Sequence, residues 1–101
     1  MQRIRTEILL CENTEEDEKV YILELLEEYS NYYVLSIYGY MDDKNLDYKL
    51  LFLSSDLSEA EKYFEQDILH HIKKGYRTTK EGEDLSIPGY SPNDVLNRYI
   101  S

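Results

Sequence analysis

The chain has 101 residues, which is enough for one domain with a small core and a marginal free energy of unfolding. Its 21 acidic and 11 basic residues give a net charge of −10, which repels polyanions such as DNA at long range. Eleven tyrosines and no tryptophan are an unusual composition. Tyrosine is favoured in strands, and it also suits half-buried and interface positions, because its apolar ring ends in a hydroxyl that needs a partner.

Cys11 is the single cysteine, so an internal disulfide is excluded and we expect a reducing compartment. No stretch approaches the roughly 20 apolar residues of a transmembrane helix. Acidic residues interrupt the N-terminal segment where a signal peptide would carry its apolar core. We therefore expect a cytoplasmic protein with no membrane partner.

The first predicted element is a strand near the N-terminus. Apolar and polar side chains alternate over residues 3–10, with the period of two that a half-buried strand requires. The acidic stretch at residues 12–18 has nothing to bury and predicts an exposed hairpin loop.

Residues 18–29 fit two interpretations. Thr14 and Asp17 resemble a capping box, and apolar residues spaced by three continue a helical pattern behind them. The β-prone run at residues 20–22 and a turn at residues 30–31 favour a strand instead. We predict the strand, and the helix remains the alternative.

Two further strands follow. Residues 32–41 are dense in β-branched and aromatic side chains, which is typical of a strand. A polar turn at residues 42–45 leads into a fourth strand at residues 47–53. Because both strands are apolar on both faces, we expect a helix on one face and a partial cover on the other.

The clearest predicted element is a helix from Ser58 to Lys74. Ser58 and Glu61 form a capping box, and Gly75 suits a left-handed stop. Apolar residues at helical spacing form one stripe, which we expect to be buried against Leu35, Ile37 and Leu51. The stripe consists of Leu57, Ala60, Phe64, Ile68, His71 and Ile72.

A short helix is predicted at the C-terminus. Residues 79–84 are a polar linker, and Ser91, Pro92 and Asp94 can cap a helix that covers the second apolar face of the sheet. The predicted fold is α+β: an antiparallel sheet of about four strands packed on one long helix, plus a short C-terminal helix. We place one domain at residues 1–79, with residues 80–101 as a linker and helix packing on it.

No pattern of catalytic or metal-binding residues stands out. The adjacent His70 and His71 point about 100° apart on a helix, so they cannot share a metal ion. Cys11 has no second thiolate or nearby histidine in sequence, and paired acids such as Asp42 and Asp43 are typical of turns. We expect no enzymatic activity, no metal site and no cofactor.

Several short motifs occur in an order that resembles the WGR domain family over residues 2–78. The central one, Tyr38-Gly39-Tyr40, stands where that family carries Trp-Gly-Arg. The other matching motifs are a basic opening at Arg3 and Arg5, a Lys-aromatic strand start at residues 19–22, Phe52, a Glu-Ala helix opening at residues 58–60, and a closing Lys-Gly-Tyr at residues 74–76. The family includes domains of poly(ADP-ribose) polymerases and bacterial proteins such as the molybdate metabolism regulator.

The resemblance implies a WGR-like fold and an interaction module. WGR domains whose role is understood bind nucleic acid: the signature aromatic stacks on a terminal sugar or base, and the arginine contacts the backbone. They also pack against neighbouring domains. The stacking role would fall to Tyr38, whereas Tyr40 supplies no cation in the arginine position. Asp42 stands where a glycine usually follows, which adds a negative charge.

Three hypotheses remain open from the sequence. In the first, a protein partner binds Tyr32, Tyr38 and Tyr40, together with Gly39. The period of two in a strand places these three tyrosines on one face, which they share with Val34 and Ser36. In the second, nucleic acid binding is retained, with Tyr38 stacking and a basic cluster on the phosphates. That cluster would consist of Lys73, Lys74, Arg77 and Lys80, joined by Arg3 and Arg5 if the first strand lies beside the helix end.

The third hypothesis is an acidic inhibitor that imitates a row of phosphates. The residues concerned are the block at 12–18 together with Glu24, Glu27 and Glu28. Such a row would compete with DNA for the basic cleft of a DNA-binding protein.

Overall fold

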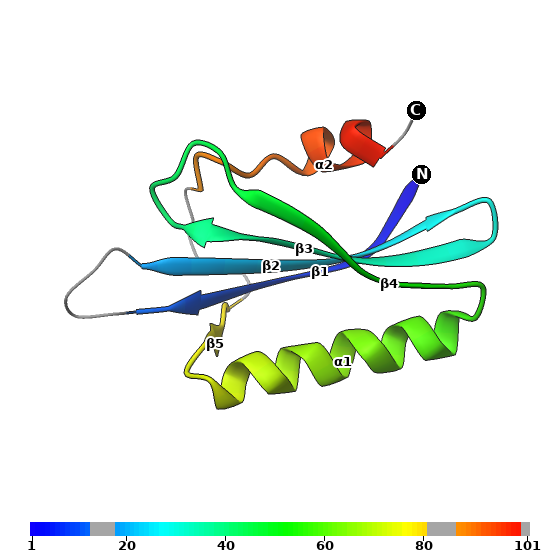
Figure 1. Ribbon diagram of the computed structural model, residues 1–101, viewed down its shortest axis with the longest axis horizontal. Helices are drawn as coiled ribbons and strands as arrows, with labels where there is room; N and C mark the ends of the chain where they lie inside the picture. The colour runs from blue at the N-terminus through cyan, green and yellow to red at the C-terminus, as the bar shows by residue number, and fades with distance from the viewer. Residues whose placement is uncertain (13–17, 81–86, 100–101) are drawn as a thin grey trace.

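The computed structural model describes residues 1–12, 18–80 and 87–99, and within these ranges it has an α+β fold (Figure 1). The strands are β1 (Gln2–Cys11), β2 (Lys19–Glu28), β3 (Asn31–Tyr40), β4 (Asp47–Ser54) and β5 (Arg77–Thr78), and the helices are α1 (Leu57–Lys73) and α2 (Pro92–Tyr99). One antiparallel sheet has the order β4-β3-β2-β1-β5, with α1 on one face and α2 on the other. The predicted fold class is confirmed. No helix in the described ranges is long and apolar enough to cross a membrane.

Residues 19–28 form a strand, so the helical alternative for this segment is wrong. Strands β2 and β3 pair over ten positions, from Lys19 opposite Tyr40 to Glu28 opposite Asn31. The turn consists of Tyr29 and Ser30, whose φ angles of 51° and 63° match the two left-handed positions of a type I′ hairpin. The turn therefore begins one residue before the position predicted from the sequence.

A bulge breaks the predicted alternation in β1. Arg3 pairs with Leu26 while Arg5 pairs with Leu25, so Ile4 is an extra residue in the ladder. Because the bulge reverses the facing of the side chains, Arg3 faces the α2 side of the sheet and Arg5 faces the α1 side.

The core between α1 and the sheet contains Ala60, Phe64 and Ile68, as predicted, but with different strand partners. The helix packs on Leu9, Tyr21, Leu23, Leu25 and Val34, with Leu51 at the margin. The expectation that it covers Leu35 and Ile37 is wrong, because these side chains point to the opposite face and pack in the α2 core. Both faces of β3 are apolar, so its pattern did not indicate which face the helix takes.

The first residue of α1 differs from the prediction, and its end agrees with it. Asp56, rather than Ser58, is the N-cap, and its Oδ1 accepts from the Ser58 backbone N–H at 2.9 Å. Gly75, at a φ of 105°, ends the helix as predicted, and the Tyr76 N–H donates to the His71 carbonyl at 3.0 Å. Ile72 is exposed rather than buried, because successive steps of four residues drift by about 40° around a helix.

The second core lies between the sheet and the C-terminal segment. Val95 of α2 and Ile87 are buried against the face formed by Leu10, Val20, Ile22, Leu26, Leu35 and Ile37. Gly89 allows this segment to approach closely, since a Cβ at this position would lie 2.6 Å from the Asp43 carbonyl oxygen. The predicted acidic loop and polar linker lie mostly outside the described residues.

Candidate functional site

An aromatic cluster lies at the C-terminal end of α1. Tyr21 of β2 stacks on His71 with ring centroids 3.7 Å apart, and Tyr76 meets both rings edge-on at 6.1 and 5.4 Å. The Tyr21 hydroxyl donates to Asp67 Oδ2 at 2.6 Å, and His71 Nδ1 donates to the Asp67 carbonyl oxygen at 2.9 Å. These contacts hold the strand, the helix and the residue after its stop in one arrangement.

Burial raises the pKa of Tyr21, and the hydrogen bond to Asp67 raises it further. The hydroxyl therefore stays protonated at neutral pH and remains a donor to the Asp67 carboxylate. Because the Tyr21 hydroxyl and the Asp67 carboxylate are hydrogen-bonded to each other, we assign the aromatic cluster a structural role.

A hollow of about 360 Å³ lies over this cluster. Its floor includes the buried Tyr21 and Ser36, while Tyr38 and Tyr76 stand among its lining residues. Tyr38 lies directly opposite Tyr21 in the β2–β3 pair, which explains its place beside α1. The remaining lining residues are Lys49, Leu51, Asp67, His70, His71 and Lys74.

The charge of the hollow is opposite to that of the chain. Lys49 and Lys74 contribute two cations, and Asp67 is the one carboxylate among the lining residues. Asp67 Oδ2 already accepts a hydrogen bond from the Tyr21 hydroxyl. With the histidines counted as neutral, the side chains that line the hollow carry a net charge of +1, whereas the chain has a net charge of −10.

The predicted tyrosines lie on one face but do not form one cluster. Tyr38 and Tyr40 are 38% and 39% exposed. Tyr32 lies six residues from Tyr38, about 20 Å along the strand, and packs partly buried near the other end of α1. Gly39 has a packing role, because a Cβ there would lie 2.8 Å from Leu46 Cδ2.

The predicted basic cluster does not assemble around Tyr38, since Arg3 and Arg5 lie elsewhere. Strand β1 does lie beside the chain that follows α1, but through Leu9 and Leu10 rather than through its basic start. Arg3 donates to the Pro92 carbonyl oxygen at 2.7 Å, and Arg5 pairs with Glu65 on α1.

Of the other predicted bases, Lys74 alone lines the hollow. Arg77 lies in β5, with its Nη2 3.6 Å from Glu12 Oε1. Lys73 is the exposed last residue of α1, and Lys80 is an exposed residue beyond β5. Lys49 was missed from the sequence because it lies in another strand and reaches the hollow only through the β3–β4 pairing.

A buried polar network on the α2 side was also missed. Glu24 is fully buried in β2 and accepts from Arg3, from Thr6 at 3.1 Å and from the Tyr90 hydroxyl. Glu24 therefore cannot belong to an exposed phosphate-like row. The available signal was an acid inside an apolar strand covered on both faces, since buried acids require partners.

Comparison with known proteins by family model, by curated sequence and by solved structure gives no match. Within the described residues, no group of three or more histidine, cysteine, aspartate or glutamate side chains could hold a metal ion.

Proposed function

We propose that this chain is a non-catalytic interaction module, similar to WGR domains, that binds a protein partner through Tyr38, Tyr40 and the hollow that Tyr38 lines. The observation that carries the proposal is the position of Tyr38, partly exposed next to a cationic hollow whose floor is fixed by Tyr21 and Asp67. Partly exposed tyrosines on a rigid support are typical anchors of protein interfaces, because their rings bury a large area at a low entropic cost.

The charges favour an acidic segment of the partner. Lys49 and Lys74 can pair with carboxylates, while Tyr38 and Leu51 offer apolar contact in the same hollow. Interface pairs of this kind improve specificity and the rate of association, and they weaken as salt is added.

Nucleic acid binding is the second candidate, and Tyr38 beside Lys74 favours it. A nucleic acid site requires several cations along the path of the phosphates. Arg3 and Arg5 contribute to other contacts far from Tyr38, and Arg77 lies beside Glu12. The dispersed bases and the absence of a cation at Tyr40 support a protein partner over a phosphate backbone.

The test is affinity capture from the lysate of the source cells, followed by calorimetric titration of the purified captured protein. We expect Tyr38→Ala to weaken binding by about 2 kcal/mol, roughly 30-fold, without loss of fold. Tyr29→Ala is the matched control, since Tyr29 is 89% exposed in the β2–β3 turn, away from the hollow.

A variant with a reversed charge, Lys74→Glu, is the second test of the proposed site. Lys74→Glu should weaken binding in a salt-dependent manner, whereas Lys62→Glu should not, because Lys62 lies on α1 outside the hollow. Equal losses in Tyr38→Ala and Tyr29→Ala, or none in either, would overturn the proposed site.

A further inference from the structure

The C-terminal segment, residues 87–99, covers the face of the sheet opposite α1 (Figure 1). Within the described ranges, no strand pairing and no backbone hydrogen bond joins this segment to the sheet. Its backbone bonds are local: the Tyr90 N–H donates to the Ile87 carbonyl oxygen at 3.1 Å, and the Val95 N–H donates to the Ser91 carbonyl oxygen at 3.1 Å. The segment can therefore leave the sheet without breaking a backbone ladder.

The segment is attached through few apolar side chains. Ile87 and Val95 are buried, and Tyr90 and Leu96 pack partly buried against the same core. The buried residues described in the other core all come from β1, β2, β3 and α1. Because that core stays intact when the segment leaves, the sheet and α1 can remain folded without it.

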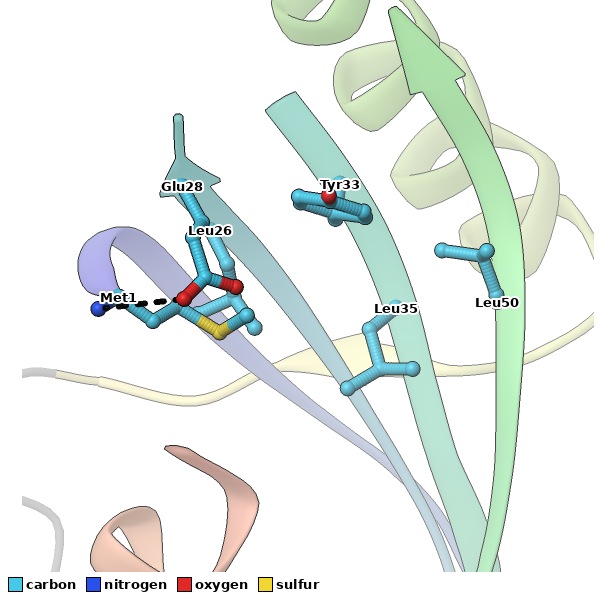
Figure 2. A pocket seen from close by; sticks show the side chains of 6 residues that line it. All are labelled: Met1, Leu26, Glu28, Tyr33, Leu35 and Leu50. Carbon is cyan, nitrogen blue, oxygen red and sulfur yellow. Dashed lines mark ion pairs between the residues drawn. The ribbon is translucent and has the colours of Figure 1, made fainter. Parts of the chain in front are cut away.

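The segment covers its sheet face incompletely. A hollow of about 90 Å³ remains on this face, and Figure 2 shows Leu26, Tyr33 and Leu35 around it, with Met1 and Leu50 at its margin. Leu26 and Leu35 are also members of the core that the segment covers, whereas Leu50 is 47% exposed. The cover therefore ends within its own core, next to side chains that contact solvent.

Polar contacts around Glu24 hold the segment in place. The Tyr90 hydroxyl donates to Glu24 Oε1, and Arg3 Nη2 donates to the Pro92 carbonyl oxygen at 2.7 Å. Glu24 is fully buried beneath these contacts, and Thr6 also donates to its Oε1, at 3.1 Å. When the segment leaves, water can replace the Tyr90 hydroxyl on the carboxylate, so opening costs only the net strength of the bond.

We propose that residues 87–99 form a strap that opens as a unit while the strands and α1 stay folded, with the hydrogen bond between Tyr90 and Glu24 as its latch. The open form has an uncovered apolar face on the side of the sheet away from Tyr38 and the cationic hollow. Opening involves only residues of this chain, so it is independent of a protein partner at Tyr38.

Native-state hydrogen exchange, followed by NMR in urea below the unfolding transition, tests the strap. The protection factor of the Val95 amide should be at least about tenfold lower than those of the slowest amides of β2 and β3. Exchange at Val95 should also depend less on urea, because opening exposes less surface than unfolding does.

A variant in the α1 core separates opening of the strap from unfolding of the domain. Ile68→Val should lower the protection factors of the slowest β2 and β3 amides about fivefold, because it destabilises the folded domain. The same variant should leave the protection factor of Val95 unchanged, because the α1 core is intact in both the closed and the open form.

A second variant tests the latch. Tyr90→Phe should lower the protection factor of Val95 about tenfold, because the closed form loses a hydrogen bond to a carboxylate. Tyr29→Phe is the matched control, since Tyr29 is 89% exposed and loses the same hydroxyl away from the strap. This control should leave the exchange of Val95 unchanged.

Three outcomes would overturn the strap or its latch. The first is equal protection of Val95 and of the slowest β2 and β3 amides, both lowered alike by Ile68→Val, because the segment then unfolds only with the domain. The second is a Val95 amide without protection, because the segment is then not held on the sheet. The third is a Tyr90→Phe variant in which Val95 exchanges as before.

Discussion

Arg3 in β1 donates to the completely buried carboxylate of Glu24 in β2, and its guanidinium also reaches the Pro92 carbonyl oxygen at 2.7 Å. The Tyr90 hydroxyl and Thr6 donate to the other carboxylate oxygen of Glu24. One buried acid therefore connects two strands with the segment that carries α2. Burial and the bond to Glu24 raise the pKa of Tyr90.

Arg3→Met should destabilise the protein by about 3 kcal/mol, because it leaves the Glu24 carboxylate buried without its cation. Arg5→Met is the matched control and should cost about 1 kcal/mol or less, since Arg5 pairs with the exposed Glu65 and covers the Phe64 ring. Urea unfolding of the two variants measures the difference. Equal losses would mean that the buried network adds little to stability.

Phe64→Ala should lower the free energy of unfolding by about 3–5 kcal/mol, which approaches the whole stability of so small a domain. Phe64 is fully buried at the centre of the α1 core, so its removal leaves a cavity. Leu69→Ala, on the exposed side of the same helix, should change stability by less than about 0.5 kcal/mol. Thermal unfolding measures both variants, and equal melting temperatures would contradict the assignment of Phe64 to the core.

Stability should fall as the pH rises above about 10. Tyr21 and Tyr90 both have a folded-state pKa above the ordinary value of 10.0, because burial and a carboxylate partner favour the protonated form. Their contribution is complete below the unfolded pKa and is lost as the pH rises through the folded pKa. Tyrosinate absorbance should show two hydroxyls that ionise only with unfolding. Tyr21→Phe should remove one of them, and an unchanged titration would contradict the buried assignment.

Oligonucleotide titration separates the two binding hypotheses. We expect no binding to blunt, nicked or single-stranded DNA tighter than about 10 μM at physiological salt, because too few cations surround Tyr38. Fluorescence polarisation measures this directly. Sub-micromolar binding that weakens steeply with salt, and that Lys74→Glu abolishes while Lys62→Glu does not, would instead support nucleic acid binding.

The local signals in the sequence were sufficient for much of the fold. The stop at Gly75 and the buried positions of Phe64 and Ile68 depend on neighbours within one or two turns of α1. The strand at residues 31–40 follows from its β-branched and aromatic density.

Only the tertiary structure decided which face and which neighbours each residue has. A strand that is apolar on both sides gives the same pattern whichever helix covers a face, so Val34 rather than Leu35 meets α1. The bulge at Ile4 separates Arg3 from Arg5, and it depends on pairing with β2 rather than on their own positions in the chain. Local periodicity determines what a residue can bury, whereas pairing over long separations determines its partners, and the Glu24 network and the cationic hollow both arise from such pairing.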